Sequence, residues 1–302
     1  MMITTTTAES AATTSRASRE WLANVRRKLF PGNSALIAGS IILGVSVIGA
    51  VASAFLGAAV NAQDLAGRLT PPAGVPGGNA QHFLGTDSLG RDVFFRILDG
   101  ARTSLTIALF AVTLGMLFGV IIGLISGYFG GWIDSVLMRF TDAVLSIPVV
   151  LLALTTIAII GGGVVNLILI IAFAQWMAFA RNTRGETMVY REMLFTTAAK
   201  SLGARNFHII RRHILPHTVP VTIVLATLSM SSAILIEAGL SFLGIGVQPP
   251  DPSLGAMLSE GRQYMSNAPW LAVFPGVAIF VLVLGINLLG DGLRVFLDRR
   301  NA

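Results

Sequence analysis

The feature that most constrains this chain is a set of long stretches without a charged residue. Asp, Glu, Lys and Arg are absent from five windows, namely residues 29–63, 103–133, 143–180, 213–236 and 263–290. A charged side chain at the centre of a bilayer costs about 2.5–3.5 kcal/mol on insertion scales, and about 20 apolar residues cross the hydrocarbon core. The windows therefore predict membrane-spanning helices.

The third window is too long for one helix and contains three consecutive glycines, at 161–163. Glycine permits a chain reversal, so this window predicts two helices, 143–160 and 164–180, and six transmembrane helices in all. Only 12% of the residues are charged, against about 25% in soluble domains. We expect an all-α membrane protein, and a soluble enzyme is excluded.

The distribution of Lys and Arg predicts the orientation. With both termini in the cytoplasm, 16 of the 21 basic residues fall on the cytoplasmic side, as the positive-inside rule requires. The apolar run is longer than the about 7–15 residues of a signal-peptide core, which favours an uncleaved first helix. The expected order is a cytoplasmic tail (1–33), the first transmembrane helix (34–60), an external loop (61–102), a five-helix core (103–294) with a cytoplasmic loop at 181–212, and a cytoplasmic tail (295–302).

The cytoplasmic loop carries the most specific pattern. Residues 187–202 favour a helix that stops at Gly203, and a second short helix is expected at 206–215, with Asn206 as its N-cap and its end at Pro216. Ala198 and Ala199 give the first helix a spot of small side chains, which a partner could approach closely. On periodicity alone, a plain amphipathic interfacial loop remains the alternative.

The sequence from Thr197 to Gly203, TAAKSLG, followed by HILP at 213–216, resembles the EAA motif of ABC importer permeases. Thr197 stands where the motif has Glu, and His213 stands where it has Ile. The resemblance implies that this loop is a coupling helix that docks on a cytoplasmic ATPase, and that a charge at Ala199 abolishes coupling. The implied coupling residues are Thr197, Ala198, Ala199, Gly203, Ile214, Leu215 and Pro216.

Three further stretches resemble the C-type permease subunit of dipeptide, oligopeptide and nickel transporters. They lie at 84–105, at 237–250 (EAGLSFLGIGVQPP) and at 287–294 (NLLGDGLR). The resemblance implies the transmembrane domain of a type I ABC importer in the bacterial cytoplasmic (inner) membrane. It also implies a heterodimer with a second permease subunit, two ATPase subunits and an extracytoplasmic substrate-binding protein. Dipeptides or oligopeptides are the expected substrates, with nickel or another small solute as the alternative.

The chain contains no G-x-x-x-x-G-K-[ST] phosphate loop, so we expect ATP and Mg to bind partner subunits and this chain to hold no cofactor. Lysine occurs only at two positions, which argues against nucleic acid as a partner. We expect no catalytic and no metal residues. An ion-coupled secondary transporter and an intramembrane enzyme are the competing classes, but the windows contain neither buried charges for the first nor a nucleophile and base for the second.

The expected external segments contain candidates for a gate or lid. From the residues alone, Asp87 and Arg91 favour a turn-rich lid in which Arg91 pairs with a neighbouring carboxylate. Glu237 ends a charge-free window, so we expect it at the membrane interface, capping the turn at 239–246; an intramembrane functional acid is the alternative. The candidate gate residues are Asp87, Arg91, Asp92, Glu237, Gly239, Phe242 and Gly244.

The topology is directly testable with reporter fusions. A fusion after Lys200 is expected to report a cytoplasmic position, and a fusion after Gln248 an external one, because the positive-inside rule places these two loops on opposite sides. Paired phosphatase and fluorescent-protein reporters in cells measure this. The reverse pattern would overturn the topology.

Overall fold

The computed structural model describes residues 32–301, and in that range the chain is helical, with no strand beyond one isolated bridge between Thr86 and Asp92. This confirms the all-helical fold. The N-terminal tail predicted at 1–33 lies almost entirely outside the described residues. The α-helices are α2 (Gly32–Leu56), α3 (Val93–Phe129), α4 (Gly131–Leu145), α5 (Val149–Ile160), α6 (Val164–Arg191), α7 (Leu194–Ser201), α8 (Asn206–Ile209), α9 (Leu215–Phe242), α10 (Leu254–Gln263) and α11 (Trp270–Asn301).

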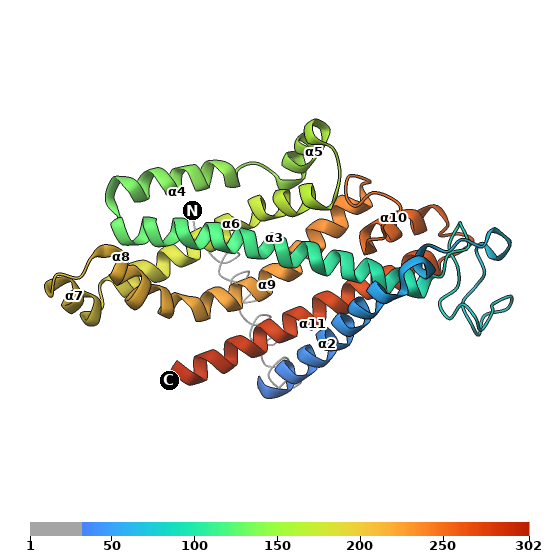
Figure 1. Ribbon diagram of the computed structural model, residues 1–302, viewed down its shortest axis with the longest axis horizontal. Helices are drawn as coiled ribbons and strands as arrows, with labels where there is room; N and C mark the ends of the chain where they lie inside the picture. The colour runs from blue at the N-terminus through green and yellow to red at the C-terminus, as the bar shows by residue number, and fades with distance from the viewer. Residues whose placement is uncertain (1–31, 302) are drawn as a thin grey trace, which may run out of the picture.

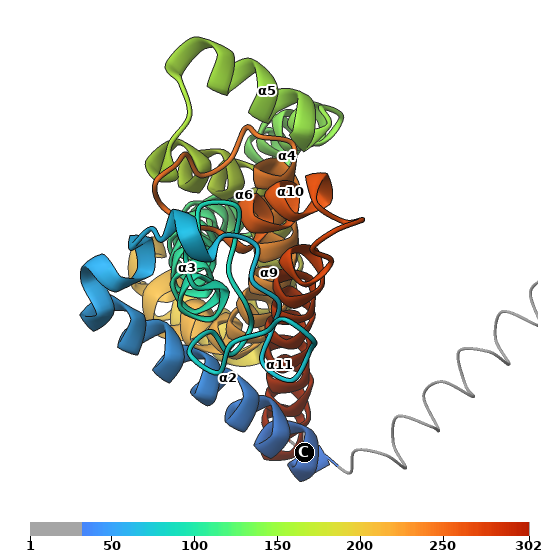
Figure 2. The same ribbon diagram turned by 90° about the vertical axis from the view of Figure 1, so that its right-hand side faces the viewer.

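In chain order the helices α2, α3, α4, α6, α9 and α11 run alternately in opposite directions, so α3 and α6 run parallel to each other (Figure 1). The α7 and α8 segment lies at one end of the molecule, and the loop at 57–92 lies with α10 towards the other end. These ends are called the α7 end and the α10 end below. The helices α4 and α5 lie on one flank of the bundle, and α2 and α11 lie on the opposite flank (Figures 1 and 2). The loops thus alternate between the two ends as the sequence predicts.

Among the described residues, five helices are long and apolar enough to cross a membrane, and the pair α4 and α5 brings the number to six if it counts as one span. The straight helix predicted at 143–160 is wrong. The chain bends by 82° between α4 and α5, and Pro148 stands at the N-cap of α5. Proline disfavours helical backbone at the residue before it, which ends α4 early. The predicted reversal at the three glycines is present.

The external loop predicted at 61–102 is too long, because α3 already begins at Val93. Asp92 caps this helix, and its Oδ1 accepts hydrogen bonds from the backbone N–H groups of Phe94 at 2.8 Å and Phe95 at 3.3 Å. An aspartate at this position satisfies N–H groups that the first turn leaves without a partner. The helix therefore starts ten residues before the charge-free window at 103.

The first turns of α3 tolerate charges because each one has a partner. Arg96 lies 3.0 Å from a carboxylate oxygen of Asp87. Asp99 accepts from Arg102 at 3.0 Å, one turn along the helix, and from the hydroxyl of Ser53 in α2 at 3.1 Å. A search for charge-free windows cannot detect such pairing, so it places the start of the helix too late.

Two other helices also extend beyond their predicted boundaries, and one is shorter than predicted. The helix α6 continues to Arg191, well into the loop predicted at 181–212, and α11 continues to Asn301, through most of the tail predicted at 295–302. The first helix, α2, ends at Leu56, before the expected residue 60. The helices α3, α6 and α11 are thus longer than the charge-free windows at their polar ends, whereas α2 is shorter than its window.

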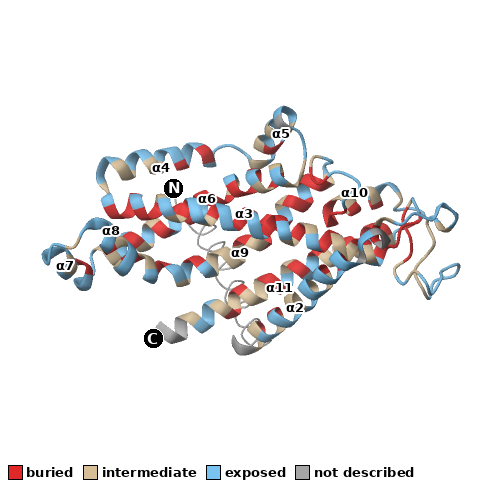
Figure 3. Cartoon of the chain, viewed as in Figure 1, coloured by how far each residue is buried: buried red, intermediate tan, exposed pale blue. Residues whose placement is uncertain are grey.

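The most extensive helix contact joins α3 and α6. Four glycines of α3 follow each other at four-residue spacing and face α6, namely Gly115, Gly119, Gly123 and Gly127. A Cβ atom at Gly123 would lie 2.6 Å from the carbonyl oxygen of Ala180 and 2.8 Å from the Cβ of Thr183. Glycine at this spacing lets two helix backbones approach closely, as in transmembrane G-x-x-x-G pairs. The buried residues of Figure 3 follow this contact.

The outer flank of α2 carries a stripe of exposed apolar side chains, with Phe55 86% exposed at its end. The stripe consists of Ile37, Ile41, Val45, Ile48, Val51 and Phe55. The other flank packs on α11 through small residues, since a Cβ at Gly285 would lie 2.7 Å from a methyl carbon of Ile42. Apolar exposure on this scale is stable against lipid.

The glycine contact predicts the effect of adding one methyl group. Gly123→Ala is expected to lower the melting temperature of the detergent-purified protein by several degrees, because overpacking a close contact costs about 1–3 kcal/mol. Gly44→Ala in α2 is the matched control, since no atom lies within 4 Å of a Cβ built there. Tryptophan fluorescence on heating measures both. Equal melting temperatures for the two variants would contradict the assignment of this contact.

Candidate functional site

The loop at the α7 end consists of two short helices joined by a tight turn. The helix predicted at 187–202 is interrupted: α6 ends at Arg191, and α7 begins only at Leu194. The hydroxyl of Thr196 donates to the carbonyl oxygen of Tyr190 at 2.8 Å, which holds α7 against the end of α6. Gly203 follows α7 with a φ of 81°, a backbone angle that favours glycine, so the predicted stop is present.

The two alanines of the EAA-like motif have different surroundings. Thr197 and Ala198 are exposed on α7, whereas Ala199 is partly buried and packs on a cluster that contains Ile209 and Ile214. The carbonyl oxygen of Ala199 also accepts from the N–H of Ala204 at 3.1 Å. The spot of two small side chains expected for a partner is thus only Ala198. A charge at Ala199 would disturb the packing of the loop itself.

Asn206 does not cap the second helix as predicted, because Arg205 occupies the N-cap position. Instead, the Oδ1 of Asn206 accepts from the Tyr128 hydroxyl of α3 at 2.9 Å. The predicted end at Pro216 is also wrong: a π-helical turn, Ile210–Ile214, continues from α8 directly into α9. Proline lies in the first turn of α9, where a missing N–H costs nothing.

The remaining HILP residues anchor the loop from within. Ile214 is fully buried, and Leu215 packs against the same cluster, together with Leu124 and Tyr128 of α3. Arg191 adds hydrogen bonds from its guanidinium to the carbonyl oxygens of Gly127 and Tyr128, at 3.3 Å and 3.2 Å. The loop is therefore attached to the ends of α3, α6 and α9.

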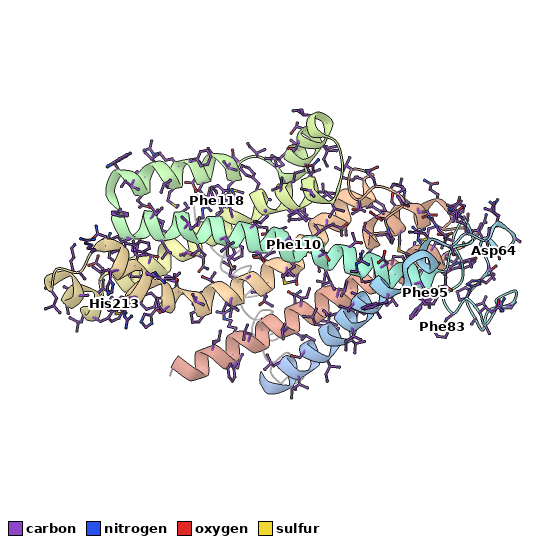
Figure 4. All side chains as sticks on the ribbon, viewed as in Figure 1. Asp64, Phe83, Phe95, Phe110, Phe118 and His213 are labelled. Carbon is purple, nitrogen blue, oxygen red and sulfur yellow. The ribbon has the colours of Figure 1, made fainter. Side chains whose placement is uncertain are left out.

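The surface of this loop is unusually apolar. Leu194, Leu202 and Phe207 are 87%, 88% and 73% exposed. His213, labelled in Figure 4, lies at the same end of the molecule. Exposed leucines beyond the membrane-spanning part of a helix bundle indicate a contact surface for another protein. The sequence motif alone did not identify these three residues.

Two arginine–carboxylate pairs join α6 to α4. Arg184 of α6 donates to both carboxylate oxygens of Asp134 in α4, from Nε at 2.5 Å and from Nη2 at 2.6 Å. The Ser126 hydroxyl of α3 also donates to this carboxylate, and Arg181 pairs with Asp142. A bidentate arginine–carboxylate pair fixes both side chains in orientation. These pairs hold the strongly bent α4 and α5 pair against the bundle.

At the α10 end, the predicted gate residues form a buried charge cluster. The Nε of Arg91 lies 2.6 Å from an oxygen of Asp87, so the predicted pairing is present. Arg96 pairs with the same carboxylate, and Glu260 of α10 lies 3.6 Å from Arg91 and 4.0 Å from Arg96. Arg96 and Glu260 were not identified from the sequence: Arg96 lies in the stretch at 84–105 without being singled out, and Glu260 lies outside the quoted motifs. We call these four residues the outer cluster.

Asp92 belongs to the same end but not to the same ion pairs. One of its oxygens caps α3, and the other lies 2.8 Å from the Nδ1 of His82. The indole N–H of Trp270 donates to the carbonyl oxygen of Thr86 at 3.3 Å and closes the loop over the start of α11. The predicted lid is therefore tied to α3, α10 and α11.

Glu237 is fully buried within α9, and its position relative to the membrane interface stays a prediction. Its carboxylate accepts from the hydroxyls of Ser104 in α3 at 2.6 Å and Ser241 at 2.7 Å. The Ser241 hydroxyl oxygen in turn accepts from the N–H of Val247 at 3.3 Å. The buried carboxylate thus fixes the turn after α9 indirectly, through Ser241.

The other predicted gate residues surround the end of α9. Gly239 is exposed, and Gly244 has a φ of 81° in the turn that follows the helix. The guanidinium carbon of Arg262 lies 5.2 Å from the ring centre of Phe242, a cation–π distance. Figure 4 shows how far this end is from the α7 end, with Asp64 and Phe83 on one side and His213 on the other.

The described residues contain no group of three or more His, Cys, Asp or Glu side chains that could hold a metal ion. The four residues of the outer cluster form ion pairs with one another, and His82 pairs with Asp92. The long helices thus join the loop at the α7 end to the ion-paired cluster at the α10 end. Such an arrangement suits a conformational change that passes from one end to the other.

Comparison with known proteins identifies the family. Residues 119–302 match the family described as binding-protein-dependent transport system inner membrane component. The glutathione transport system permease protein GsiD of Shigella flexneri serotype 5b is 50% identical over 222 residues, which cover 74% of this chain and 73% of the relative. The same-named protein of Pectobacterium atrosepticum is 44% identical over 222 residues, with 74% of each chain covered.

The chain belongs to the binding-protein-dependent transport permeases. In this family the chain is a multi-pass subunit of an ABC importer in the bacterial inner membrane, and ATP is hydrolysed by partner subunits. An inward-facing structure of the MetNI methionine ABC transporter has the same fold, with a TM-score of 0.56, 19% identity, and coverage of 67% of this chain and 96% of the other. The permease works with ATPase and substrate-binding partners.

Proposed function

We propose that this permease forms half of the translocation pathway of an importer for short peptides, and that the loop at the α7 end couples it to the ATPase. The observation that carries the coupling role is the exposed apolar surface of Leu194, Leu202 and Phe207 beside Ala198. This surface stands on a loop that is anchored to three long helices. A partner that moves the loop would therefore move the helices with it.

The mechanism is alternating access. ATP, bound with Mg to two ATPase subunits, closes those subunits and displaces α7, and the displacement turns the helix bundle so that its cavity opens to the outside. A loaded substrate-binding protein docks at the α10 end and releases its substrate into the cavity. Nucleotide acts only through its different affinity for the two arrangements. This places the α7 end and both termini in the cytoplasm, in agreement with the charge distribution.

A second permease subunit completes the pathway. A hollow of about 370 Å³ opens between α6, α9 and α11, and Asn182, Glu186 and Arg294 are among the residues that line it. Polar side chains on an open face of a membrane-spanning bundle are stable where they line a water-filled cavity. We assign this hollow to the cytoplasmic part of the pathway, closed on its open side by the second subunit.

The substrate class follows from the relatives and the motifs together. The relatives are permeases of glutathione transport systems, and glutathione is itself a short peptide. The stretches at 84–105 and 237–250 resemble those of the C-type permease subunit of dipeptide, oligopeptide and nickel transporters. Glutathione and dipeptides are thus the first substrates to test, and a nickel chelate or another small solute is the alternative. The substrate-binding protein selects among them before docking.

The coupling role predicts the effect of a charge on the exposed face of α7. Ala198→Asp is expected to reduce the ATPase activity stimulated by the loaded binding protein about ten-fold or more, because it places an unpaired charge in the apolar contact. Ser135→Asp is the matched control, because Ser135 is exposed in α4 at the same end of the molecule but outside the loop, and it should retain full stimulation. The measurement is phosphate release by the reconstituted complex. Full stimulation of Ala198→Asp would remove α7 from the coupling mechanism.

A further inference from the structure

We propose that α10 is the link through which docking of the substrate-binding protein reaches α9, and that Glu260 and Glu237 are the positioning residues at its two ends. This inference rests on the proposed function. It assigns to the α10 end a counterpart of the coupling loop at the α7 end. The rigid helix α10 joins the loop at 57–92, called the outer loop below, to the membrane-spanning helix α9. Three sets of contacts carry it.

The first set joins α10 to the outer loop. The Ser88 hydroxyl donates to a carboxylate oxygen of Glu260 at 2.6 Å, and the other oxygen faces Arg91 and Arg96 of the outer cluster. Both arginines are more than nine-tenths buried, and both also pair with Asp87. Glu260 is the one member of this cluster that comes from α10. A displacement of the outer loop therefore pulls directly on this helix.

The second set joins the start of α10 to α9. Ser253 is fully buried and caps α10, accepting from the N–H of Ala256 at 3.2 Å. Ser253 also interacts with the carboxylate of Glu237, which accepts hydrogen bonds from Ser104 and Ser241. One buried carboxylate thus joins α3, α9 and α10. Loss of any donor leaves a buried polar group unsatisfied, so these contacts are made or broken together.

The third set of contacts fixes α10 against α9 and α11 along its length. A Cβ at Gly255 would lie 2.6 Å from the Cα of Ala238 in α9, and one at Gly261 would lie 2.6 Å from the N of Ala272 in α11. The hydroxyl of Ser259 donates to the carbonyl oxygen of Phe242 at 2.8 Å. The helix is therefore packed at backbone distance against both neighbours and can move only with them.

These contacts give a short path for the docking signal. A ten-residue helix is about 15 Å long, which is the distance over which α10 transmits a displacement. At one end the loaded binding protein shifts the outer loop, and with it Glu260. At the other end Glu237 lies within α9, which continues through the π-helical turn into the coupling loop. The path from the external surface to α7 therefore contains a single membrane-spanning helix.

The test compares Glu260→Ala and Glu260→Gln with Asp251→Asn in the complete transporter in proteoliposomes. Asp251 is exposed and forms no ion pair in the described part of the chain, so its variant removes one negative charge from the same external segment without touching the link. The measurements are phosphate release without and with the binding protein loaded with glutathione, and the affinity of that protein for the complex.

We expect Glu260→Ala to reduce the stimulation about five-fold or more, with unchanged affinity for the binding protein and unchanged ATPase activity in its absence. Glu260→Gln keeps the hydrogen bond from Ser88 and should lie between Glu260→Ala and the wild type. A purely structural role would instead lower the activity without the binding protein and the amount of assembled complex. Asp251→Asn should match the wild type.

Three results would overturn the link. Full stimulation of Glu260→Ala removes α10 from the path. A loss of affinity that saturating binding protein corrects makes Glu260 a docking residue instead. A loss of stimulation in Asp251→Asn equal to that of Glu260→Ala makes the effect one of surface charge. The proposed function fails separately, and is recognised by a wild-type complex that no loaded binding protein stimulates and that Ala198→Asp leaves unchanged.

Discussion

The close contact between α3 and α6 is the constraint on which the rest of the structure depends. Without a hydrophobic driving force between helices in lipid, backbone approach at glycine supplies the packing that holds two long helices together. Here four glycines place one face of α3 directly on α6, from Gly115 to Gly127. Hydrogen bonds of Tyr128 and Arg191 attach the coupling loop to the end of this helix pair. A loop on such a rigid support moves with the bundle and does not bend independently of it.

Different interactions attach the two ends of the molecule to the long helices. At the α7 end, a small apolar cluster around Ile209 and Ile214 fixes the loop, and its outward leucines remain available for a partner. At the α10 end, buried carboxylates do the fixing, with hydroxyls on Glu237 and guanidinium groups on Asp87. Directional hydrogen bonds and ion pairs define a geometry more sharply than apolar packing does. Both ends are thus attached to the long helices, which is what alternating access requires.

The sequence predicts much of this because lipid imposes a simple rule. Charge-free windows locate the helices, and the EAA-like motif locates the loop at the α7 end. The same rule fails where charges are paired: Arg96 and Asp99 lie inside α3, and the charge-free window misses ten residues of helix. The rule also gives no information on how the helices pack against one another. The glycine repeat of α3 is visible in the sequence as G-x-x-x-G, but neither the bend before Pro148 nor the burial of Glu237 is visible. Those depend on which helices become neighbours.

The central claim is that ATP hydrolysis by partner subunits, transmitted through this permease, drives import. The most direct measurement is uptake of labelled glutathione or dipeptide into proteoliposomes that contain the complete transporter and its binding protein. We expect uptake that requires hydrolysable ATP, persists in the presence of an ionophore, and stops when the ATPase subunits are inactivated. Uptake that survives ATPase inactivation and collapses with the ionophore would contradict it and establish an ion-coupled transporter.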